Sequence, residues 1–207
     1  MRHIGIFGGT FDPPHEGHLG VARAALRSGL VDEVRIMVSP ENPFKAGRRM
    51  TPARERLRMV ELAIDSLPED ERPLIHASDF ELSLPTPTYT IDTLHALGAA
   101  YPDCHFHLII GGDNLTAFRR WRGPDEIMRD YGLIIYPRPG DSEWDPTLLP
   151  SGCVILEDVP LFPYSSTEVR RVAHEEPERL HEMLPGRVAE YVLSHGLYRT
   201  ESHEHRE

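Results

Sequence analysis

Two histidines three positions apart, His15 and His18, stand just after a short apolar run gives way to a glycine-rich segment. The apolar run over residues 4–7 indicates a buried strand. Gly8 and Gly9 after it allow a tight turn in which backbone N–H groups can approach a ligand closely. A helix is expected to begin near His18, and a helix N-terminus attracts anions through its unpaired N–H groups and its dipole. The segment therefore predicts a phosphate-binding loop between a strand and a helix. No third ligand follows at a metal-binding spacing, so no metal site is predicted here.

Apolar strands and amphipathic helices alternate along the rest of the chain without internal repeats. This alternation predicts a single-domain, Rossmann-like α/β fold, in which a mostly parallel sheet has helices on both faces. In such a fold, ligands bind at the carboxyl ends of the strands, where the strand order reverses. Besides the first strand, the pattern predicts strands over 34–38, 74–77, 106–110, 133–136 and 154–156, and helices that begin near 18, 52, 89, 166 and 185.

Two of these helices have recognisable start signals. Thr51 is expected to be the N-cap of the second helix, with Pro52 in its first turn. Ser165 and Glu168 have the spacing of a capping box, which predicts that Arg170 lies near the start of a helix. The buried stripe of the second helix is expected to contain Leu57, Val60 and Ile64.

The composition limits the classes of partner. The 207 residues include 22 basic and 33 acidic side chains, for a net charge of −11, and 40% of them are hydrophobic. This charge argues against a nucleic-acid surface, and the hydrophobic fraction is sufficient for a core. The first strand begins by Ile4, which leaves no room for a signal peptide, and no apolar run approaches the length of a membrane span. Cys104 and Cys153 have no metal-binding spacing and suit a reducing compartment.

These features predict a cytoplasmic protein without nucleic-acid or membrane partners. One domain is expected over residues 1–200, followed by a disordered polar tail over 201–207. The sequence is compatible with a homo-oligomer and does not decide the oligomeric state.

The segment from Gly8 to His18, GGTFDPPHEGH, resembles the G-G-T-F-D-P-x-H-x-G-H signature of the nucleotidyltransferases with the HxGH motif. That signature alone identifies only a superfamily, which also contains pantetheine-phosphate adenylyltransferases and cytidylyltransferases. Later motifs cover nearly the whole chain and are similar to those of bacterial nicotinate-nucleotide adenylyltransferases. They are TPTYT (86–90), IIGGD (109–113), Trp121, RPG (138–140), SSTEVR (165–170) and GLY (196–198).

The resemblance implies transfer of AMP from ATP to nicotinate mononucleotide, giving deamido-NAD and pyrophosphate in NAD biosynthesis. Mg²⁺ would be bound together with ATP. The nucleophile would be the 5′-phosphate of the mononucleotide, which needs no general base, so the protein must position two polyanions and neutralise the developing charge. The resemblance assigns the catalytic work to His15, His18, Lys45 and Arg170. It assigns ATP binding to Gly8, Gly9, Thr10, Phe11, Gly111, Asp113, Ser166 and Thr167, and mononucleotide binding to Thr88, Tyr89, Thr90 and Trp121.

Taken alone, several of these residues have ordinary structural roles. The two histidines could serve only to cap a helix, Asp113 could be the N-cap of the next helix, and Trp121 could belong to the core. Asp12 is expected to orient the loop by binding backbone N–H groups rather than to take part in the reaction.

The acceptor substrate is left open by one departure from the family pattern. Many relatives have asparagines soon after the second strand, where this chain has Ser-Pro-Glu-Asn over 39–42. Nicotinamide mononucleotide therefore remains an alternative acceptor. Phosphopantetheine is a weaker one, because Trp121 and the 86–90 segment favour a pyridine ring. A non-catalytic nucleotide sensor is a third hypothesis, against which the presence of all four catalytic candidates argues.

Overall fold

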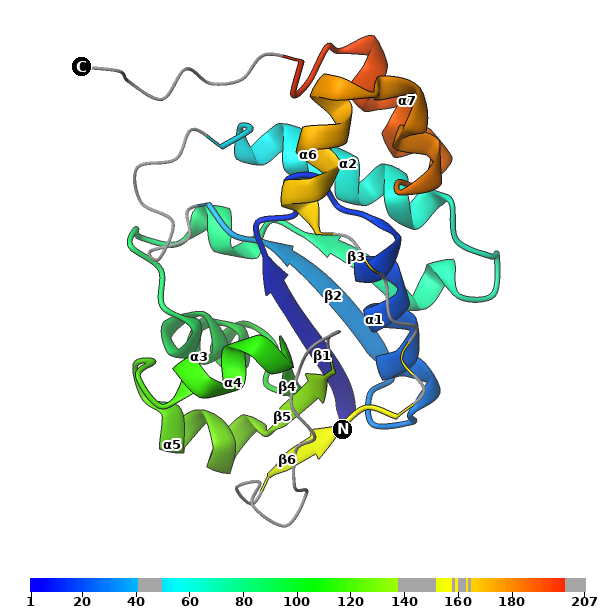
Figure 1. Ribbon diagram of the computed structural model, residues 1–207. Coiled ribbons are helices and arrows are strands. Elements are labelled where there is room, and N and C mark those ends of the chain that lie inside the picture. The colour runs from blue at the N-terminus through cyan, green and yellow to red at the C-terminus, as the bar shows by residue number, and fades with distance from the viewer. Residues whose placement is uncertain (41–49, 138–151, 158, 160–162, 164, 200–207) are drawn as a thin grey trace, which may run out of the picture.

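The core of the molecule is a six-stranded parallel sheet (Figure 1). The computed structural model describes residues 1–40, 50–137, 152–157, 159, 163 and 165–199. The strand order is β3-β2-β1-β4-β5-β6, so the order reverses between β1 and β4. The strands are β1 (Arg2–Gly9), β2 (Glu33–Val38), β3 (Ile75–Ser78), β4 (Cys104–Gly111), β5 (Leu133–Tyr136) and β6 (Cys153–Ile155).

Helices cover both faces of this sheet, as the sequence pattern predicts. One set packs its apolar side chains on a cluster that contains Phe7, Ile36 and Ile109. The other set packs on a second cluster that contains Ile4 and Leu108. The first set consists of α1 (Glu16–Arg27), α2 (Ala53–Asp65), α6 (Ser166–Glu175) and α7 (Gly186–Ser194). The second consists of α3 (Thr90–Ala100), α4 (Gly112–Phe118) and a π-helical turn, Ile127–Tyr131.

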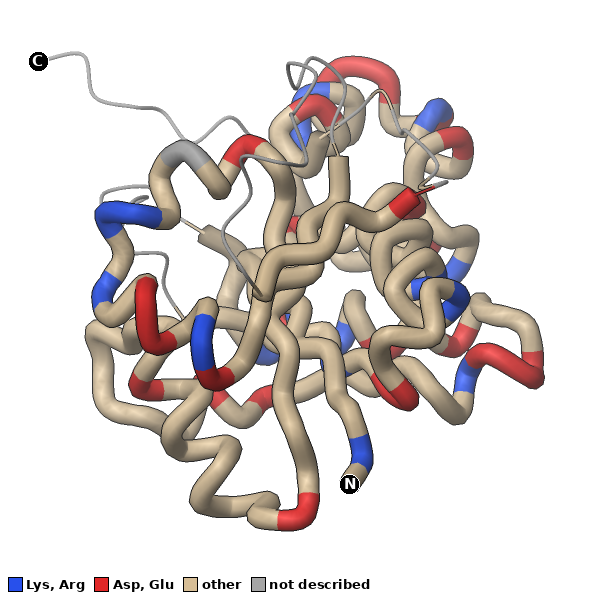
Figure 2. The backbone as a smooth tube through the Cα atoms, turned by 90° about the horizontal axis from the view of Figure 1, so that it is seen from below, with Lys and Arg blue, Asp and Glu red and all other residues tan. Residues whose placement is uncertain are grey.

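Shorter helical segments complete the described part of the chain. They are η2 (Arg72–Leu74), η3 (Phe80–Ser83), α5 (Pro124–Glu126) and η6 (Pro177–Glu182). Charged residues lie mainly on the outer helices and loops, while the central strands are largely uncharged (Figure 2). No helix in the described ranges is both long enough and apolar enough to cross a membrane.

The predicted strands are all present, and their ends differ from the predicted ones by at most two residues. The predicted N-cap Thr51 is wrong, because α2 begins at Ala53 and Pro52 occupies the N-cap position. Both backbone groups of Thr51 have tertiary partners instead. Its N–H donates to Oδ2 of Asp12 (3.4 Å) and its carbonyl accepts from Nε of Arg56 (2.8 Å). A cap inferred from local spacing cannot anticipate these distant contacts.

The predicted capping box at α6 is half formed. Ser165 is the N-cap, and its Oγ accepts a hydrogen bond from the main-chain N–H of Glu168 (3.3 Å). The Glu168 carboxylate binds Arg171 (2.6 Å), one turn further along the helix. The helix therefore starts where the sequence predicts, although the return contact of the box is replaced by a surface ion pair.

Candidate active site

A cavity of about 1180 Å³ opens at the carboxyl ends of β1 and β4, where the strand order reverses. This is the position at which open α/β sheets bind their ligands. Fifteen of the sixteen residues predicted for the site line this cavity; the sixteenth, Lys45, lies outside the described residues. The lining residues are Gly8, Gly9, Thr10, Phe11, His15, His18, Thr88, Tyr89, Thr90, Gly111, Asp113, Trp121, Ser166, Thr167 and Arg170.

The loop after β1 approaches the cavity closely because its glycines carry no side chain. A Cβ added at Gly8 would meet no atom within 4 Å, so this glycine borders open space. A Cβ at Gly9 would lie 3.0 Å from the ring of Phe11, which leaves little room for a larger residue there. Phe11 itself has φ = 48°, in the left-handed region that residues with a side chain rarely adopt. The loop backbone is therefore held in an unusual conformation at the edge of the cavity.

His15 and His18 form one unit at the start of α1. His15 is the N-cap, and its main-chain N–H donates to Nδ1 of His18 (3.0 Å). A ring nitrogen that accepts a hydrogen bond carries no hydrogen, so a neutral His18 has its hydrogen on Nε2. The centroids of the two rings are 3.7 Å apart. The histidines thus cap the helix and line the cavity at the same time, and the structural and functional interpretations coincide.

Arg170 connects α6 to the loop after β1. Its Nη1 donates to the main-chain oxygen of Asp12 (2.5 Å), and its Nη2 donates to Oγ1 of Thr167 (2.8 Å). Ser166 Oγ donates to the main-chain oxygen of Pro13 (2.9 Å). The first turn of α6 is therefore attached to the same loop that carries His15. Arg170 therefore lines the same cavity as His15 and His18.

The most deeply buried charged residue near the loop is Arg56, which the sequence analysis did not identify. It is 1% exposed, and burial lowers its pKa, while the nearby Asp12 opposes this shift. Its Nη1 donates to the carbonyls of Thr10 (2.6 Å) and Ser39 (2.9 Å), and its Nη2 to that of Pro40 (3.1 Å). The sequence does contain a signal for this burial. Arg56 comes three and four positions before Met59 and Val60, so it lies on the same buried face of α2 as they do.

The end of β4 forms a second wall of the cavity. Gly111 is the N-cap of α4, and a Cβ there would collide with Oδ1 of Asp113 and lie 3.0 Å from the hydroxyl of Tyr136. Asp113 lies in the first turn of α4 rather than at the N-cap, and it accepts a hydrogen bond from Asn114 (3.1 Å). The exposed carboxylate of Asp113 at the cavity edge suits a pair of ribose hydroxyls. Only glycine at position 111 leaves room for this arrangement.

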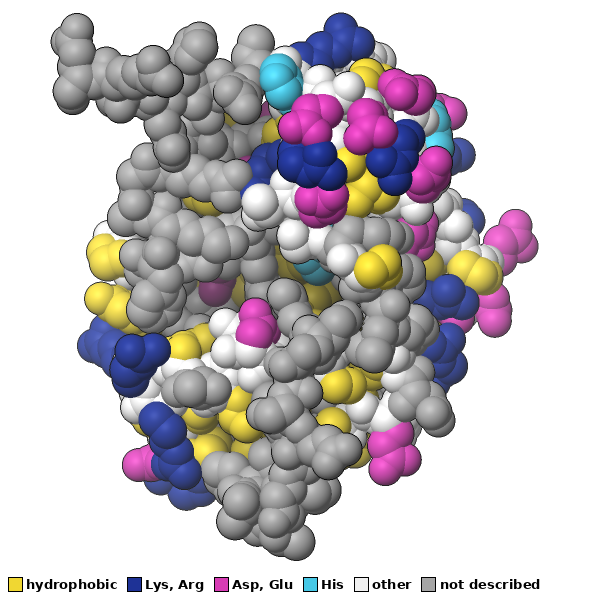
Figure 3. All heavy atoms as spheres, in the orientation of Figure 1, with side chains coloured by type: hydrophobic (Ala, Val, Ile, Leu, Met, Phe, Trp, Pro, Cys, Tyr) yellow, Lys and Arg dark blue, Asp and Glu magenta, His cyan; other side chains and the backbone are white. Residues whose placement is uncertain are grey.

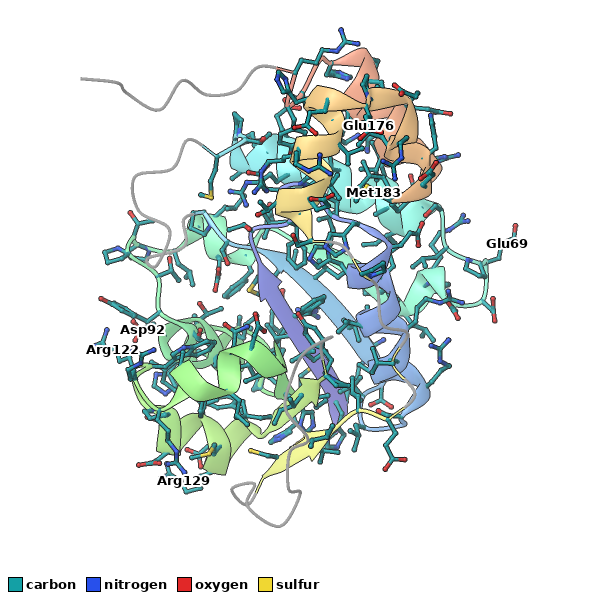
Figure 4. All side chains as sticks on the ribbon, viewed as in Figure 1. Glu69, Asp92, Arg122, Arg129, Glu176 and Met183 are labelled. Atoms are coloured by element: carbon teal, nitrogen blue, oxygen red, sulfur yellow. The ribbon has the colours of Figure 1, made fainter. Side chains whose placement is uncertain are left out.

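The N-terminus of α3 and the segment after α4 form the third wall. Tyr89 is the N-cap of α3 and is 40% exposed, and the guanidinium of Arg122 lies 5.1 Å from the centre of its ring. Arg122 also forms an ion pair with Asp92 (3.0 Å), and the two side chains lie beside each other in Figure 4. Trp121 is half-buried, with its ring centroid 5.4 Å from that of Phe118. Trp121 thus belongs to the core on one side and to the cavity on the other.

The surface over α6 and the adjoining η6 carries acidic and basic side chains side by side (Figure 3). Arg171 pairs with Glu168 and Glu175, and Arg179 pairs with Glu176 (3.0 Å). Such exposed pairs contribute little to stability. They also mean that this surface carries charges of both signs.

The chain matches a model of the cytidylyltransferase-like family over residues 6–172. It is 41% identical over 188 residues to a probable nicotinate-nucleotide adenylyltransferase of Bacteroides thetaiotaomicron, and the match covers 91% of this chain and 89% of that protein. It is 36% identical over 199 residues to the nicotinate-nucleotide adenylyltransferase of Bacillus subtilis, covering 96% of this chain and 99% of that one.

A solved structure has the same fold at low sequence identity. The nicotinic acid mononucleotide adenylyltransferase of Plasmodium falciparum, solved in complex with NaAD, superimposes with a TM-score of 0.79. The identity is 18%, and the match covers 97% of this chain and 99% of that one. Since the family model spans most of the chain and the sequence relatives match over nearly their whole length, this chain belongs to the cytidylyltransferase-like family and, within it, to the nicotinate-nucleotide adenylyltransferases.

Proposed function

We propose that this chain transfers the AMP moiety of ATP to nicotinate mononucleotide, forming deamido-NAD and pyrophosphate in NAD biosynthesis. The observation that carries the proposal is one cavity in which two of the walls differ in their chemistry. One wall has a phosphate loop, two histidines and an arginine, and the other has a half-buried tryptophan beside the N-terminus of a helix. The cavity is large enough for a nucleoside triphosphate and a mononucleotide together.

The reaction requires positioning rather than a nucleophilic side chain. An oxygen of the mononucleotide 5′-phosphate forms a bond to the α-phosphorus of ATP, the bond from that phosphorus to the bridging oxygen breaks, and its electron pair leaves with pyrophosphate. The attacking phosphate is already anionic at neutral pH, so no general base is needed. What limits the rate is the alignment of two polyanions and the charge that develops on the α-phosphoryl group and the leaving group.

We assign the α- and β-phosphates of ATP to the N-terminus of α1, at His15 and His18. The hydrogen bond from His15 N–H to Nδ1 of His18 leaves Nε2 as the donor nitrogen of the neutral ring. A donor fixed in advance toward the place where charge develops stabilises a transition state more than it stabilises the ground state. His18 therefore carries most of the proposed catalytic effect, and the amide and hydroxyl groups of Thr10 support it as phosphate ligands, together with the backbone of Gly8, Gly9 and Phe11.

We assign the β- and γ-phosphates to Arg170, whose planar fork suits phosphate oxygens. Ser166 and Thr167 in the same helical turn provide additional hydroxyl groups near the loop. Asp113, with Gly111 leaving it room, is assigned to the adenosine ribose. Lys45 remains a prediction from the resemblance.

We assign the pyridine ring to Trp121 and the nicotinate carboxylate to the N-terminus of α3, at Thr88, Tyr89 and Thr90. A large aromatic face that is half-buried and borders the cavity suits a stacked ring. The N-terminus of an eleven-residue helix favours a carboxylate over a neutral amide. The helix N-terminus supports nicotinate over nicotinamide mononucleotide, whereas stacking on Trp121 suits the pyridine ring of either.

We propose that Mg²⁺ enters with ATP. Across the described ranges, no group of three or more His, Cys, Asp or Glu side chains could hold a metal ion. Mg²⁺ commonly keeps several waters and binds to substrate phosphates, so it fits a site with few protein ligands. Bound there, it would neutralise charge on the phosphates, and the protein residues named above would align them.

The test is the release of pyrophosphate from Mg-ATP with each of three acceptors: nicotinate mononucleotide, nicotinamide mononucleotide and phosphopantetheine. A strong preference for the first supports the proposal. A preference for nicotinamide mononucleotide would move the specificity argument to residues 39–42. Binding of ATP without turnover with any acceptor would favour the nucleotide sensor.

A further inference from the structure

We propose that Tyr198, near the end of the described chain, is a positioning residue that holds the phosphate loop in place through Asp12. The inference rests on the proposed function, because it names how the ATP side of that site is kept in its working geometry. Tyr198 does not line the cavity and is not expected to contact either substrate.

The contact between the two residues spans 186 positions of sequence. The Tyr198 hydroxyl donates a hydrogen bond of 2.6 Å to Oδ1 of Asp12. Asp12 is 5% exposed, so its carboxylate is nearly withdrawn from water and needs hydrogen-bond partners within the protein. Its second oxygen accepts from the main-chain N–H of Thr51 (3.4 Å). Among the contacts described, the tyrosine provides the shorter one.

The backbone near Tyr198 is shaped to reach the loop. After α7, the chain turns at Gly196 (φ = 62°), and Tyr198 itself has φ = 63°. A tyrosine rarely adopts this left-handed conformation, and it persists only where the surrounding structure determines it. The N–H of Leu197 donates to the carbonyl of Val192 (3.0 Å), which attaches this turn to α7. Tyr198 is thus strained at one end of the contact, and Phe11, the neighbour of Asp12 at the other end, also has a left-handed φ.

Asp12 passes the constraint on to a proposed phosphate ligand. Its side chain binds Tyr198, and its main-chain oxygen accepts from Nη1 of Arg170 (2.5 Å). A shift of Asp12 therefore displaces the oxygen that orients the guanidinium. Phosphoryl transfer depends on alignment to within a fraction of an ångström, so a small displacement at this point is felt in the reaction.

The same surroundings keep the hydroxyl of Tyr198 protonated, so that it can donate its hydrogen bond. Burial raises its pKa, and the adjacent carboxylate of Asp12 raises it further. The phenol is therefore protonated at any pH at which the protein would work. The contact is a permanent support of the loop rather than a pH-dependent switch.

The experiment is the Tyr198→Phe variant, which removes one oxygen atom. We expect kcat/KM for Mg-ATP to fall about tenfold. KM for nicotinate mononucleotide should stay within about twofold of the wild-type value, because the residues proposed to bind the pyridine ring and its carboxylate belong to α3 and to the segment after α4. The matched control is Tyr191→Phe. Tyr191 in α7 also donates to a carboxylate, Glu55 (2.6 Å), but this acceptor belongs to α2 and not to the loop after β1. The control should leave both kinetic constants unchanged.

A second variant separates positioning from stability. If the hydroxyl acts through Asp12, then the double variant Asp12→Ala/Tyr198→Phe loses no more activity than Asp12→Ala alone, because alanine removes the acceptor. Fully additive losses would overturn the inference. So would a Tyr198→Phe protein that melts at a lower temperature yet keeps the wild-type kcat/KM for Mg-ATP at a temperature where it is folded.

The proposed function and this inference fail in different ways. Wild-type turnover that Tyr198→Phe does not change overturns the inference alone. Absence of wild-type turnover overturns the proposed function, and the variants are then compared for their binding of α,β-methylene-ATP by calorimetry. About tenfold weaker binding by Tyr198→Phe than by Tyr191→Phe supports the inference, and equal binding overturns it.

Discussion

The guanidinium of Arg56 donates a hydrogen bond of 2.6 Å to the main-chain oxygen of Thr10, in the turn between β1 and the histidines. In a trans peptide the carbonyl and the following N–H point in opposite directions. Arg56 therefore turns the N–H of Phe11 away from itself, on a loop that borders the cavity. The same side chain also donates to the carbonyls of Ser39 and Thr51, so it links the loop after β1 to the segment after β2 and to the segment before α2.

Arg56→Met is expected to lower the free energy of unfolding by about 3 kcal/mol, because it leaves the partly buried carbonyls of Thr10, Ser39, Pro40 and Thr51 without the donor that Arg56 provides. Arg56→Lys keeps the charge but has too few fixed donors for all four carbonyls. Its free energy of unfolding should therefore fall by less than that of Arg56→Met. Urea unfolding of the three proteins measures the difference. A loss below about 1 kcal/mol in Arg56→Met would mean that water replaces the guanidinium.

His18 is expected to act through Nε2 rather than through the helix cap. His18→Ala removes both functions, whereas the amide oxygen of His18→Asn can still accept from the N–H of His15. We expect both variants to lower kcat about 100-fold or more, with His18→Asn keeping the wild-type melting temperature. Wild-type kcat in His18→Asn would show that the ring serves only as a cap.

Gly8 is expected to lie against bound ATP. The space beside it is open, so Gly8→Ala should fold normally and raise KM for Mg-ATP about tenfold by occupying the ligand's volume. Gly98 in α3 is the control, since a Cβ there also meets no atom within 4 Å but lies outside the cavity. Steady-state kinetics compare the two variants. An unchanged KM in Gly8→Ala would place the phosphates elsewhere.

Trp121 is expected to determine affinity for the mononucleotide. Trp121→Ala should raise KM for nicotinate mononucleotide by roughly 10-fold or more, since stacking and the burial of a large aromatic surface are both lost. KM for Mg-ATP should stay nearly constant, and Trp121→Phe should recover part of the loss. Equal increases in both KM values would indicate a role in the core, alongside Phe118, instead of a role in recognition.

A group of histidines at the opposite end of the sheet predicts acid sensitivity. Nδ1 of His3 and Nε2 of His107 are 2.9 Å apart, and His105 packs against both rings. Burial, then the neighbouring His105 and His3, lower the pKa of His107 to about 4, against a contact with the backbone of Tyr131 that raises it. The unfolded chain, with an ordinary histidine pKa near 6.5, therefore binds a proton before the folded chain does.

Stability from His107 is thus present above about pH 6.5 and is lost as the pH falls toward 4. Between pH 7 and 5 the loss is expected to be about 1 to 2 kcal/mol after allowance for solvent screening. His107→Gln should remove this part of the pH dependence. Urea unfolding at pH 7 and pH 5 measures this loss of stability. The control is His95→Gln, because His95 is an exposed histidine that pairs with Glu126. An identical pH dependence in wild type and His107→Gln would contradict the assignment.

The sequence was sufficient for the parts of the structure that depend on local pattern. Each apolar run became a strand, and Ser165 starts α6, because periodicity and capping are properties of neighbouring residues. The local rule failed at Thr51, whose backbone is taken by Asp12 and Arg56. It also missed Arg56, since an arginine is normally assigned to solvent, and here its guanidinium donates to four carbonyls, three of which are at least 16 positions away in the sequence.

The site was predictable for a different reason. The family motifs are scattered over the chain, and the fold brings all but one of the sixteen site residues they supply to one cavity, Lys45 lying outside the described residues. The contacts between these motifs could not be read from them. No spacing rule connects Asp12 to Tyr198 or to Arg170, 158 positions away, because only the tertiary fold makes them neighbours.

The most direct test of the account follows the phosphates of ATP. Wild-type protein is incubated with nicotinate mononucleotide and ATP labelled either at the α- or at the γ-phosphate, and the products are separated by chromatography. Adenylyl transfer predicts that the α-label enters deamido-NAD and the γ-label appears in pyrophosphate. Transfer of the γ-label to the mononucleotide, or no labelled dinucleotide under conditions in which ATP binds, would contradict it.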